Sequence, residues 1–187
     1  MRFSDLMEVK TTFFHGSRSE ISKFSFDFIS NDGGRKLEGP GIYFTSDKTD
    51  ANVYGSFVHE VVLDLRKTKL LPVKKTFSIQ DVKNLIMKSP NADDYLTDWA
   101  ENPQKALQVA AKSIYDSYGP NQYKEMVTQV WADFYKYEDK DWLKEMVALG
   151  YDGLMVERAG GIRHFICYNP DIIKGVSLLN NEDHGLS

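Results

Sequence analysis

The chain has 187 residues, 42% of them hydrophobic and 27% charged, a composition that predicts one globular domain and excludes a disordered or fibrous segment. It contains neither an apolar run of the roughly 18 residues that a membrane-spanning helix needs nor a signal peptide, so we expect a cytoplasmic protein without a membrane partner. A single cysteine excludes an intrachain disulfide and a multi-cysteine zinc site, and a net charge of −4 argues against a broad phosphate-binding surface.

Short strands and turns are predicted for the N-terminal third of the chain. β-Branched and aromatic residues predict strands over Thr11 to His15 and Gly41 to Thr45, and strict alternation of apolar side chains predicts a third over Phe57 to Leu65. The glycine-rich stretch from Asn31 to Pro40 predicts turns with positive φ angles. Ser46 to Tyr54 is predicted as a short helix that begins at a serine or aspartate cap.

The middle of the chain, residues 78–150, changes to a helical period. Ser78 with an aspartate three residues later predicts the start of a first helix, and Asn102-Pro103 predicts the start of a second. Gly119-Pro120 separates this second helix from an aromatic-rich third, and a fourth is predicted from about Asp139 to Leu149. We therefore expect a helical block between two strand-rich ends.

The C-terminal part of the chain returns to strands. Gly153 to Glu157 and Arg163 to Tyr168 predict two strands, and the link Ala159-Gly160-Gly161 between them predicts a hairpin. The order of strands, helices and strands predicts an α+β fold. In this interpretation a β core of residues 11–74 and 150–179 carries a helical insertion of residues 75–149.

Three aromatic or imidazole side chains are candidates for a binding site. Taken alone, His15 is typical of a structural histidine bonded to backbone, and Tyr43 and Tyr54 are typical of core residues. Their order and spacing favour a site instead, because together they resemble the dinucleotide site of the ADP-ribosyltransferase superfamily, in the diphtheria-toxin-like, poly(ADP-ribose)-polymerase-like branch that uses a His-Tyr-Glu triad. The matching segments are Phe14-His15-Gly16-Ser17-Arg18, Gly39-Pro40-Gly41-Ile42-Tyr43-Phe44 and Tyr54, which follows Tyr43 by 11 residues.

The resemblance covers residues of about 12–65 and 150–174. It implies the fold of that superfamily, a split β core, here with an inserted helical lobe. It also implies NAD⁺ as co-substrate and no metal. By this likeness His15 hydrogen-bonds the adenosine ribose, Gly16 pairs its backbone with the nicotinamide carboxamide, Tyr43 and Tyr54 sandwich the nicotinamide ring, and Ser17 and Arg18 lie along the adenosine side.

Elementary chemistry agrees with these implied roles. Oxidised nicotinamide is a flat cation, and a stacked tyrosine attracts such a cation by about 0.5 to 2 kcal/mol. A glycine after His15 lets the backbone approach an amide closely, and an arginine can bind a diphosphate. For Arg18 a solvated loop charge is an equally good interpretation.

The third position of the triad departs from the family pattern. The strand that corresponds to the glutamate motif is His164-Phe165-Ile166-Cys167-Tyr168-Asn169-Pro170, so His164 occupies the glutamate position. The nicotinamide–ribose bond breaks with oxocarbenium character, which a nearby carboxylate stabilises. We interpret Glu157, at the end of the paired strand, as the replacement; the alternative is an exposed charge at the end of a hairpin. The expected catalytic set is His15, Tyr43, Glu157 and His164.

The resemblance predicts a mono-ADP-ribosyltransferase that cleaves NAD⁺, releases nicotinamide and passes one ADP-ribose to a macromolecular acceptor, a protein in preference to a nucleic acid. Single transfer is expected because chain-elongating members rely on the glutamate that is missing here. Analogy with stand-alone transferases of bacteria and phages suggests a toxin or a counter-defence factor.

Three alternatives stay open. A degenerate module could bind NAD⁺ or a target without turnover, which His164 in the glutamate position favours. A glycohydrolase that uses water as acceptor would share every motif described above. The tRNA 2′-phosphotransferase relatives of the same fold need a basic RNA groove, which the net charge of −4 argues against.

Overall fold

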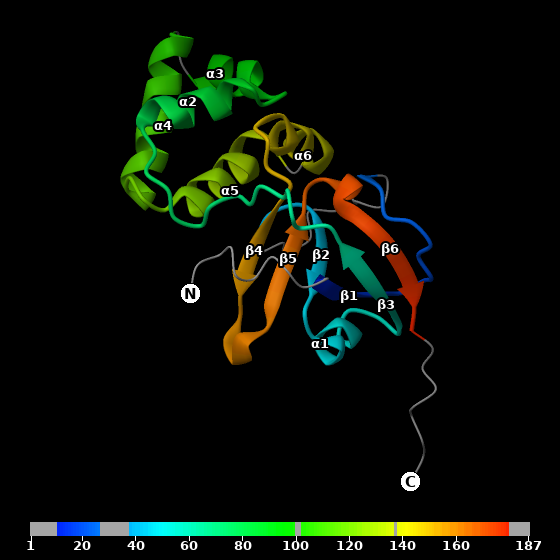
Figure 1. Ribbon diagram of the computed structural model, residues 1–187. Helices are drawn as coiled ribbons and strands as arrows, with labels where there is room; N and C mark the ends of the chain where they lie inside the picture. Colours follow the sequence, from blue (N-terminus) through cyan, green and yellow to red (C-terminus); the bar gives the residue numbers. More distant parts are fainter. Residues whose placement is uncertain (1–10, 27–37, 100–101, 137, 180–187) are drawn as a thin grey trace.

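A computed structural model of the chain describes residues 11–26, 38–99, 102–136 and 138–179 (Figure 1). Within these residues the strands form one antiparallel sheet in the order β4-β5-β2-β1-β3-β6. This sheet and the helices beside it confirm the predicted α+β class. The strands are β1 (Thr11–Ser17), β2 (Ile42–Thr45), β3 (Phe57–Leu63), β4 (Gly153–Glu157), β5 (Arg163–Cys167) and β6 (Ile173–Leu178).

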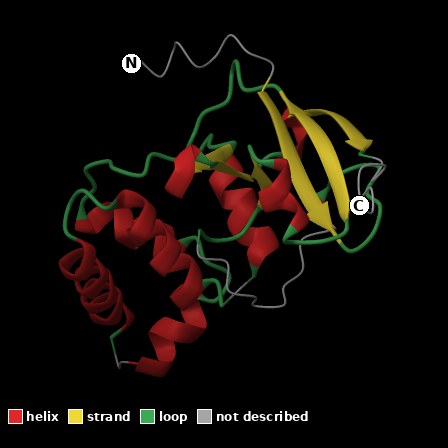
Figure 2. Cartoon of the chain, turned by 90° about the horizontal axis from the view of Figure 1, so that it is seen from below, coloured by secondary structure: helices red, strands yellow, loops and turns green. Residues whose placement is uncertain are grey.

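Along the chain, a short helix follows β2, and a run of longer helices connects β3 to β4. Figure 2 shows most of the helices gathered into a body beside the strands. In the described part of the chain, no helix combines the length and the apolar character that crossing a bilayer requires. The helices are α1 (Lys48–Asn52), α2 (Ile79–Met87), α3 (Ala92–Trp99), α4 (Pro103–Tyr118), α5 (Tyr123–Phe134) and α6 (Asp139–Ala148).

The caps predicted from the sequence begin three of these helices. The Asp47 carboxylate accepts a hydrogen bond from the first turn of α1, and Asn102 does the same for α4. Ser78 and Asp81 form a reciprocal capping box at the start of α2. The positive φ expected in the glycine-rich turn is present at Gly39, with φ of 86°; most of that turn lies outside the described residues.

Two elements were missing from the sequence prediction. Helix α3 begins at Ala92, shortly after α2 ends at Met87, in a short stretch that is rich in aspartate, and the sequence prediction does not separate it from α2. Strand β6 carries Lys174, Gly175 and Ser177, which break the apolar alternation expected of a strand. It forms nonetheless because it pairs antiparallel with β3 from His59 to Leu63, with one register shift between Val62 and Leu63.

The sheet is nearly divided between β1 and β2. Their described pairing consists of Phe14 opposite Thr45, whereas β1 pairs with β3 along its whole length. The sheet therefore has one half made of β4, β5 and β2 and another made of β1, β3 and β6, and α1 packs against β1, β2 and β3 where the halves meet (Figure 1).

Buried side chains of the helices and of the sheet form a single apolar cluster. It includes Phe13 and Phe165 from the sheet and Met126, Trp142 and Leu143 from α5 and α6, all almost completely buried. The helical block is thus packed onto the sheet through a shared core. Its status as an insertion into a β core stays a prediction.

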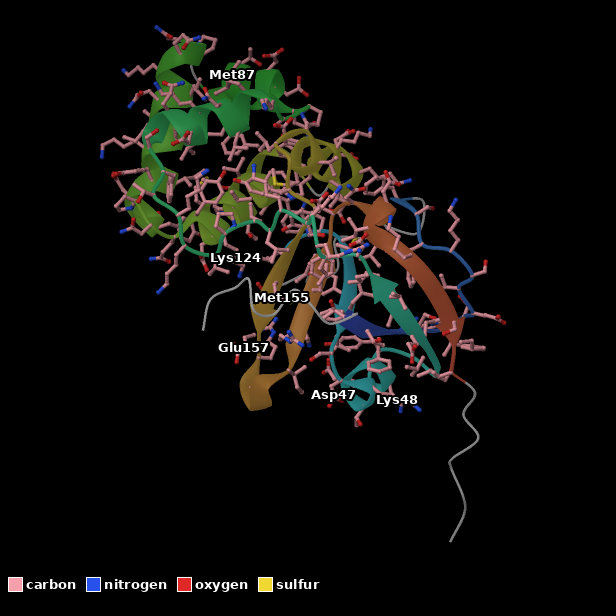
Figure 3. The ribbon with its side chains drawn as sticks, viewed as in Figure 1. Asp47, Lys48, Met87, Lys124, Met155 and Glu157 are labelled. Carbon is pink, nitrogen blue, oxygen red and sulfur yellow. The ribbon has the colours of Figure 1, made fainter. Side chains whose placement is uncertain are left out.

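A buried carboxylate ties this block to both the sheet and the loop before β2. Glu38 is 6% exposed, and its Oε1 accepts a hydrogen bond of 2.7 Å from Nη2 of Arg158, beyond β4. Its Oε2 lies 2.5 Å from Nζ of Lys124 on α5, a residue labelled in Figure 3. One anion therefore joins three segments that are distant in sequence.

We expect Glu38→Gln to lower the free energy of unfolding by about 2 kcal/mol, because Lys124 and Arg158 would lose a largely desolvated partner. Denaturant titration measures this loss. Asp116→Asn, which removes an exposed partner of Lys112 on α4, serves as the control and should cost about 0.5 kcal/mol or less. Equal losses in the two variants would contradict the account.

Candidate functional site

A cavity of about 850 Å³ opens where the two halves of the sheet meet. Strands β1, β2 and β5, helix α1 and the β4–β5 hairpin contribute its walls. The lining residues that bear on chemistry are His15, Gly16, Tyr43, Asp50, Tyr54, Arg158 and His164. Five of the eight predicted site residues, from four separate segments, are therefore brought together.

His15 presents a hydrogen-bond acceptor. Its Nδ1 lies 2.8 Å from the carbonyl oxygen of Tyr43, and because a carbonyl only accepts, Nδ1 carries the proton and Nε2 keeps a free lone pair. Burial lowers the pKa of His15 below its ordinary value of 6.5, against an opposing effect of the Tyr43 carbonyl; His59 lowers it further. The rings of Phe24 and Phe44 pack edge-on against the imidazole. His15 is thus a neutral acceptor at neutral pH.

Gly16 has no room for a side chain. A Cβ at this position would lie 1.8 Å from the carbonyl oxygen of Ala51 on α1. The family resemblance explains this glycine by the approach of a ligand, and the structure adds a second reason, the approach of a helix. Gly16 therefore sets how closely α1 packs on β1.

The two tyrosines line the cavity in different ways. The Tyr43 hydroxyl donates a hydrogen bond of 2.5 Å to the carbonyl of Gly39, and burial raises its pKa, so it stays protonated and its ring face is what remains for a ligand. Tyr54 follows α1 and is 61% exposed. An exposed aromatic ring at the edge of a cavity can stack on a planar ligand without first breaking a packed core.

Ser17 and Arg18 are not among the residues that line the cavity. The Ser17 hydroxyl donates to the carbonyl of Ser19, and the Arg18 side chain is exposed. Arg158 lines the cavity instead, held there by Glu38. Sequence reasoning missed Arg158 because its approach depends on the hairpin turn after β4.

His164 and Glu157 do not share a face of the sheet. The residue directly opposite His164 on β4 is Val156, while Glu157 pairs with Arg163. Because side chains alternate along a strand, Glu157 points to the face opposite His164. Glu157 is also exposed and is not among the lining residues. Figure 3 labels it at the hairpin end of the edge strand β4.

Asp50 is a carboxylate at the cavity that sequence reasoning missed. It lies on α1, and its Oδ2 is 2.9 Å from Nε2 of His164. Its position in the predicted helix between β2 and Tyr54 was a usable signal, since that helix separates two candidate ligand-binding tyrosines. Nothing in the sequence, however, indicates that a residue 114 positions away lies beside it.

His59 contacts the backbone of His15 from the neighbouring strand β3. It is fully buried on β3 opposite His15, and its Nε2 accepts a 2.9 Å hydrogen bond from the backbone N–H of Ile21. Since that nitrogen accepts, the proton is on Nδ1, which lies 3.4 Å from the carbonyl oxygen of His15. His59 therefore holds the loop after β1 against the strand, a role that the sequence did not reveal.

A metal site needs a group of ligating side chains, and thiol chemistry needs a cysteine, of which the chain has one, Cys167. In the described ranges, no three side chains of His, Cys, Asp or Glu gather as a metal site would need. Cys167 is buried, and its burial raises the pKa of the thiol to about 12, so it stays a thiol at neutral pH.

A family model described as "ADP-Ribosyltransferase in polyvalent proteins" matches residues 10–183. The chain belongs to this ADP-ribosyltransferase family. No curated protein matches it. A solved structure titled "Crystal structure of an anti-CRISPR protein" is similar at 16% identity and a TM-score of 0.38, over 92% of this chain and 98% of the other. The family assignment rests on the match over residues 10–183.

We expect Gly16→Ala to destabilise the protein by about 1 to 3 kcal/mol, because the added methyl group displaces α1 from β1. Denaturant unfolding measures the loss. Gly175→Ala is the matched control, since a Cβ there would meet Val62 at an ordinary 3.7 Å. A Gly16→Ala protein as stable as Gly175→Ala would contradict the proposed packing constraint.

The lowered pKa of His15 makes stability depend on pH. The unfolded chain takes up a proton at His15 near its ordinary pKa of 6.5, whereas the folded chain does so only at lower pH. The stability contributed by His15 is therefore present above about pH 6.5 and is lost as the pH falls from there through the folded pKa.

His15→Asn should show less of this acid-side loss, because asparagine can still donate to the Tyr43 carbonyl but does not titrate. Melting temperatures of the two proteins between about pH 8 and pH 5 test this expectation. If the melting temperatures of the two proteins change with pH by the same amount across that range, His15 is excluded as the source of the pH dependence.

Proposed function

We propose that this protein is a mono-ADP-ribosyltransferase of the diphtheria-toxin-like branch, which cleaves NAD⁺, releases nicotinamide and transfers one ADP-ribose to a macromolecular acceptor, a protein in preference to a nucleic acid. The observation that carries the proposal is the cavity in which His15, Gly16, Tyr43 and Tyr54 meet, within a chain of the ADP-ribosyltransferase family. By the family resemblance, Gly16, Tyr43 and Tyr54 hold the nicotinamide, and His15 binds the adenosine ribose.

Three of the four, His15, Tyr43 and Tyr54, have side chains with the chemistry that their proposed roles need. Nε2 of His15 can accept a hydrogen bond from a ribose hydroxyl, because the imidazole is neutral and Nδ1 is occupied. The faces of Tyr43 and Tyr54 can attract the nicotinamide cation. The cavity is also large enough for a bound group of this size, since ligand cavities commonly measure about 300 to 1,000 Å³.

The reaction follows from the charge of the substrate. The bond between nicotinamide N1 and ribose C1′ breaks, and nicotinamide leaves with the bonding electron pair as a neutral molecule. The positive charge passes to the ribose, where C1′ is attacked by a nucleophile of the acceptor, which loses one proton to solvent. Holding NAD⁺ and acceptor in one cavity makes this attack effectively intramolecular.

Incubation with NAD⁺ labelled on the adenosine side tests the proposal, with nicotinamide release and label transfer followed in the presence and absence of bacterial lysate. Transfer of label to a protein supports it. Release without transfer would indicate a glycohydrolase. Neither reaction, with NAD⁺ still raising the melting temperature, would indicate a binding module and would overturn the transferase proposal. A role as a toxin or counter-defence factor stays a prediction that rests on analogy.

Tyr54→Ala should weaken NAD⁺ binding by about two- to thirtyfold, the loss of one ring–cation contact. The ring is largely exposed, so the melting temperature without ligand should stay near that of the unmodified protein. Calorimetric titration measures the affinity, with Tyr54→Phe as a control that keeps the ring and should bind nearly normally. Unchanged affinity in Tyr54→Ala would argue against the sandwich.

A further inference from the structure

The described residues that line the cavity include one carboxylate, that of Asp50. A carboxylate only accepts hydrogen bonds, so in the 2.9 Å contact with His164 the imidazole Nε2–H is the donor. His164 is the residue at the position where the family resemblance expects a glutamate. A carboxylate is therefore present beside that position, but it is supplied by α1 instead of by β5.

The start of α1 is fixed to β5 next to His164. The backbone N–H of Arg163 donates a 2.9 Å hydrogen bond to the Ser46 hydroxyl, and the N–H of Ser46 donates 2.8 Å to the carbonyl of Arg163. Within the helix, the N–H of Asp50 donates 2.8 Å to the Asp47 carboxylate. The backbone of Asp50 is thus held in place, and the contact with His164 sets the direction of its side chain.

The environment of Asp50 suits a charge that acts on a bound ligand. Its side chain is 24% exposed and that of His164 is 12% exposed, so water screens the carboxylate less than at an open surface. Two other carboxylates, those of Asp47 and Glu157, are not free to act on a ligand in the cavity. Asp47 is occupied as the cap of α1, and Glu157 points to the other face of the sheet.

We propose that Asp50 is the catalytic carboxylate of the proposed reaction and that His164 is its positioning residue. This inference rests on the proposed function. As the C1′–N1 bond breaks and nicotinamide leaves with the electron pair, positive charge develops on the ribose, and the Asp50 carboxylate stabilises that charge. No proton moves to or from Asp50 in this step. His164 donates its Nε2–H to one carboxylate oxygen and leaves the other for the substrate.

Asp50→Asn is the most direct test, because it removes the charge and keeps both the size of the side chain and an oxygen that accepts from His164. It should slow nicotinamide release by about a hundred- to a thousandfold, while NAD⁺ still raises the melting temperature. Asp116→Asn makes the same chemical change at an exposed position on α4 and should leave the rate unchanged. Glu157→Gln tests the rival carboxylate and should have little effect.

A pair of variants tests the positioning role of His164. His164→Leu removes the N–H donor, and we expect it to lower kcat by about tenfold or more with a smaller change in KM. His164→Gln keeps a side-chain N–H near the same place and should recover much of the loss. If His164 has only a structural role, both variants should have a lower melting temperature, and His164→Leu should not show a fall in kcat that exceeds the change in KM.

The outcomes separate the inference from the function on which it rests. If the unmodified protein releases no nicotinamide, the proposed function and this inference both fail. If it does, and Asp50→Asn keeps a rate within about threefold, or Glu157→Gln abolishes release instead, only the inference fails. Loss of NAD⁺ binding in Asp50→Asn would likewise overturn the catalytic role. If Asp50→Asn does not fold, equal kcat values in the two His164 variants overturn the inference.

Discussion

The site depends on the close contact between β1 and α1 at Gly16. The strand carries His15, and the helix carries Asp50 and leads to Tyr54, so the distance between these two elements sets the distance between an acceptor, a carboxylate and an aromatic ring. A Cβ at Gly16 would overlap the carbonyl of Ala51. Interiors are packed at crystal-like density, so such an overlap cannot be absorbed locally and would move the helix. The glycine in the family motif therefore has a structural reason that is independent of any ligand.

Among the described residues that line the cavity are one carboxylate, Asp50, and one arginine, Arg158, and each has a charged or polar partner on another segment. Glu38 holds Arg158 at the hairpin and Lys124 on α5, and Asp50 meets His164. Low local polarity strengthens such contacts and also makes an unpaired member costly. The same pairs thus join the helical block and the hairpin to the sheet and place charged groups beside the cavity.

Much of this structure could be predicted from local sequence signals. The caps at Asp47, Ser78 and Asn102 are short-range hydrogen-bonding patterns, and they begin helices as expected. The β4–β5 hairpin is local in the same sense. Strand β6 was missed because its pairing with β3 is long-range. The contact of His164 with the first turn of α1 was missed for the same reason. The sequence also leaves the register of β4 and β5 uncertain by one residue, and the observed register turns Glu157 away from His164.

The cavity at the split of the sheet is the proposed binding site for the nicotinamide half of NAD⁺. A crystal structure of the Asp50→Asn variant with NAD⁺ tests this proposal most directly, because slow turnover leaves the dinucleotide intact. We expect a nicotinamide ring between Tyr43 and Tyr54, with a hydroxyl of the adenosine ribose on Nε2 of His15 and C1′ facing residue 50. A dinucleotide bound elsewhere on the protein, or with its nicotinamide outside these two rings, would contradict the proposal.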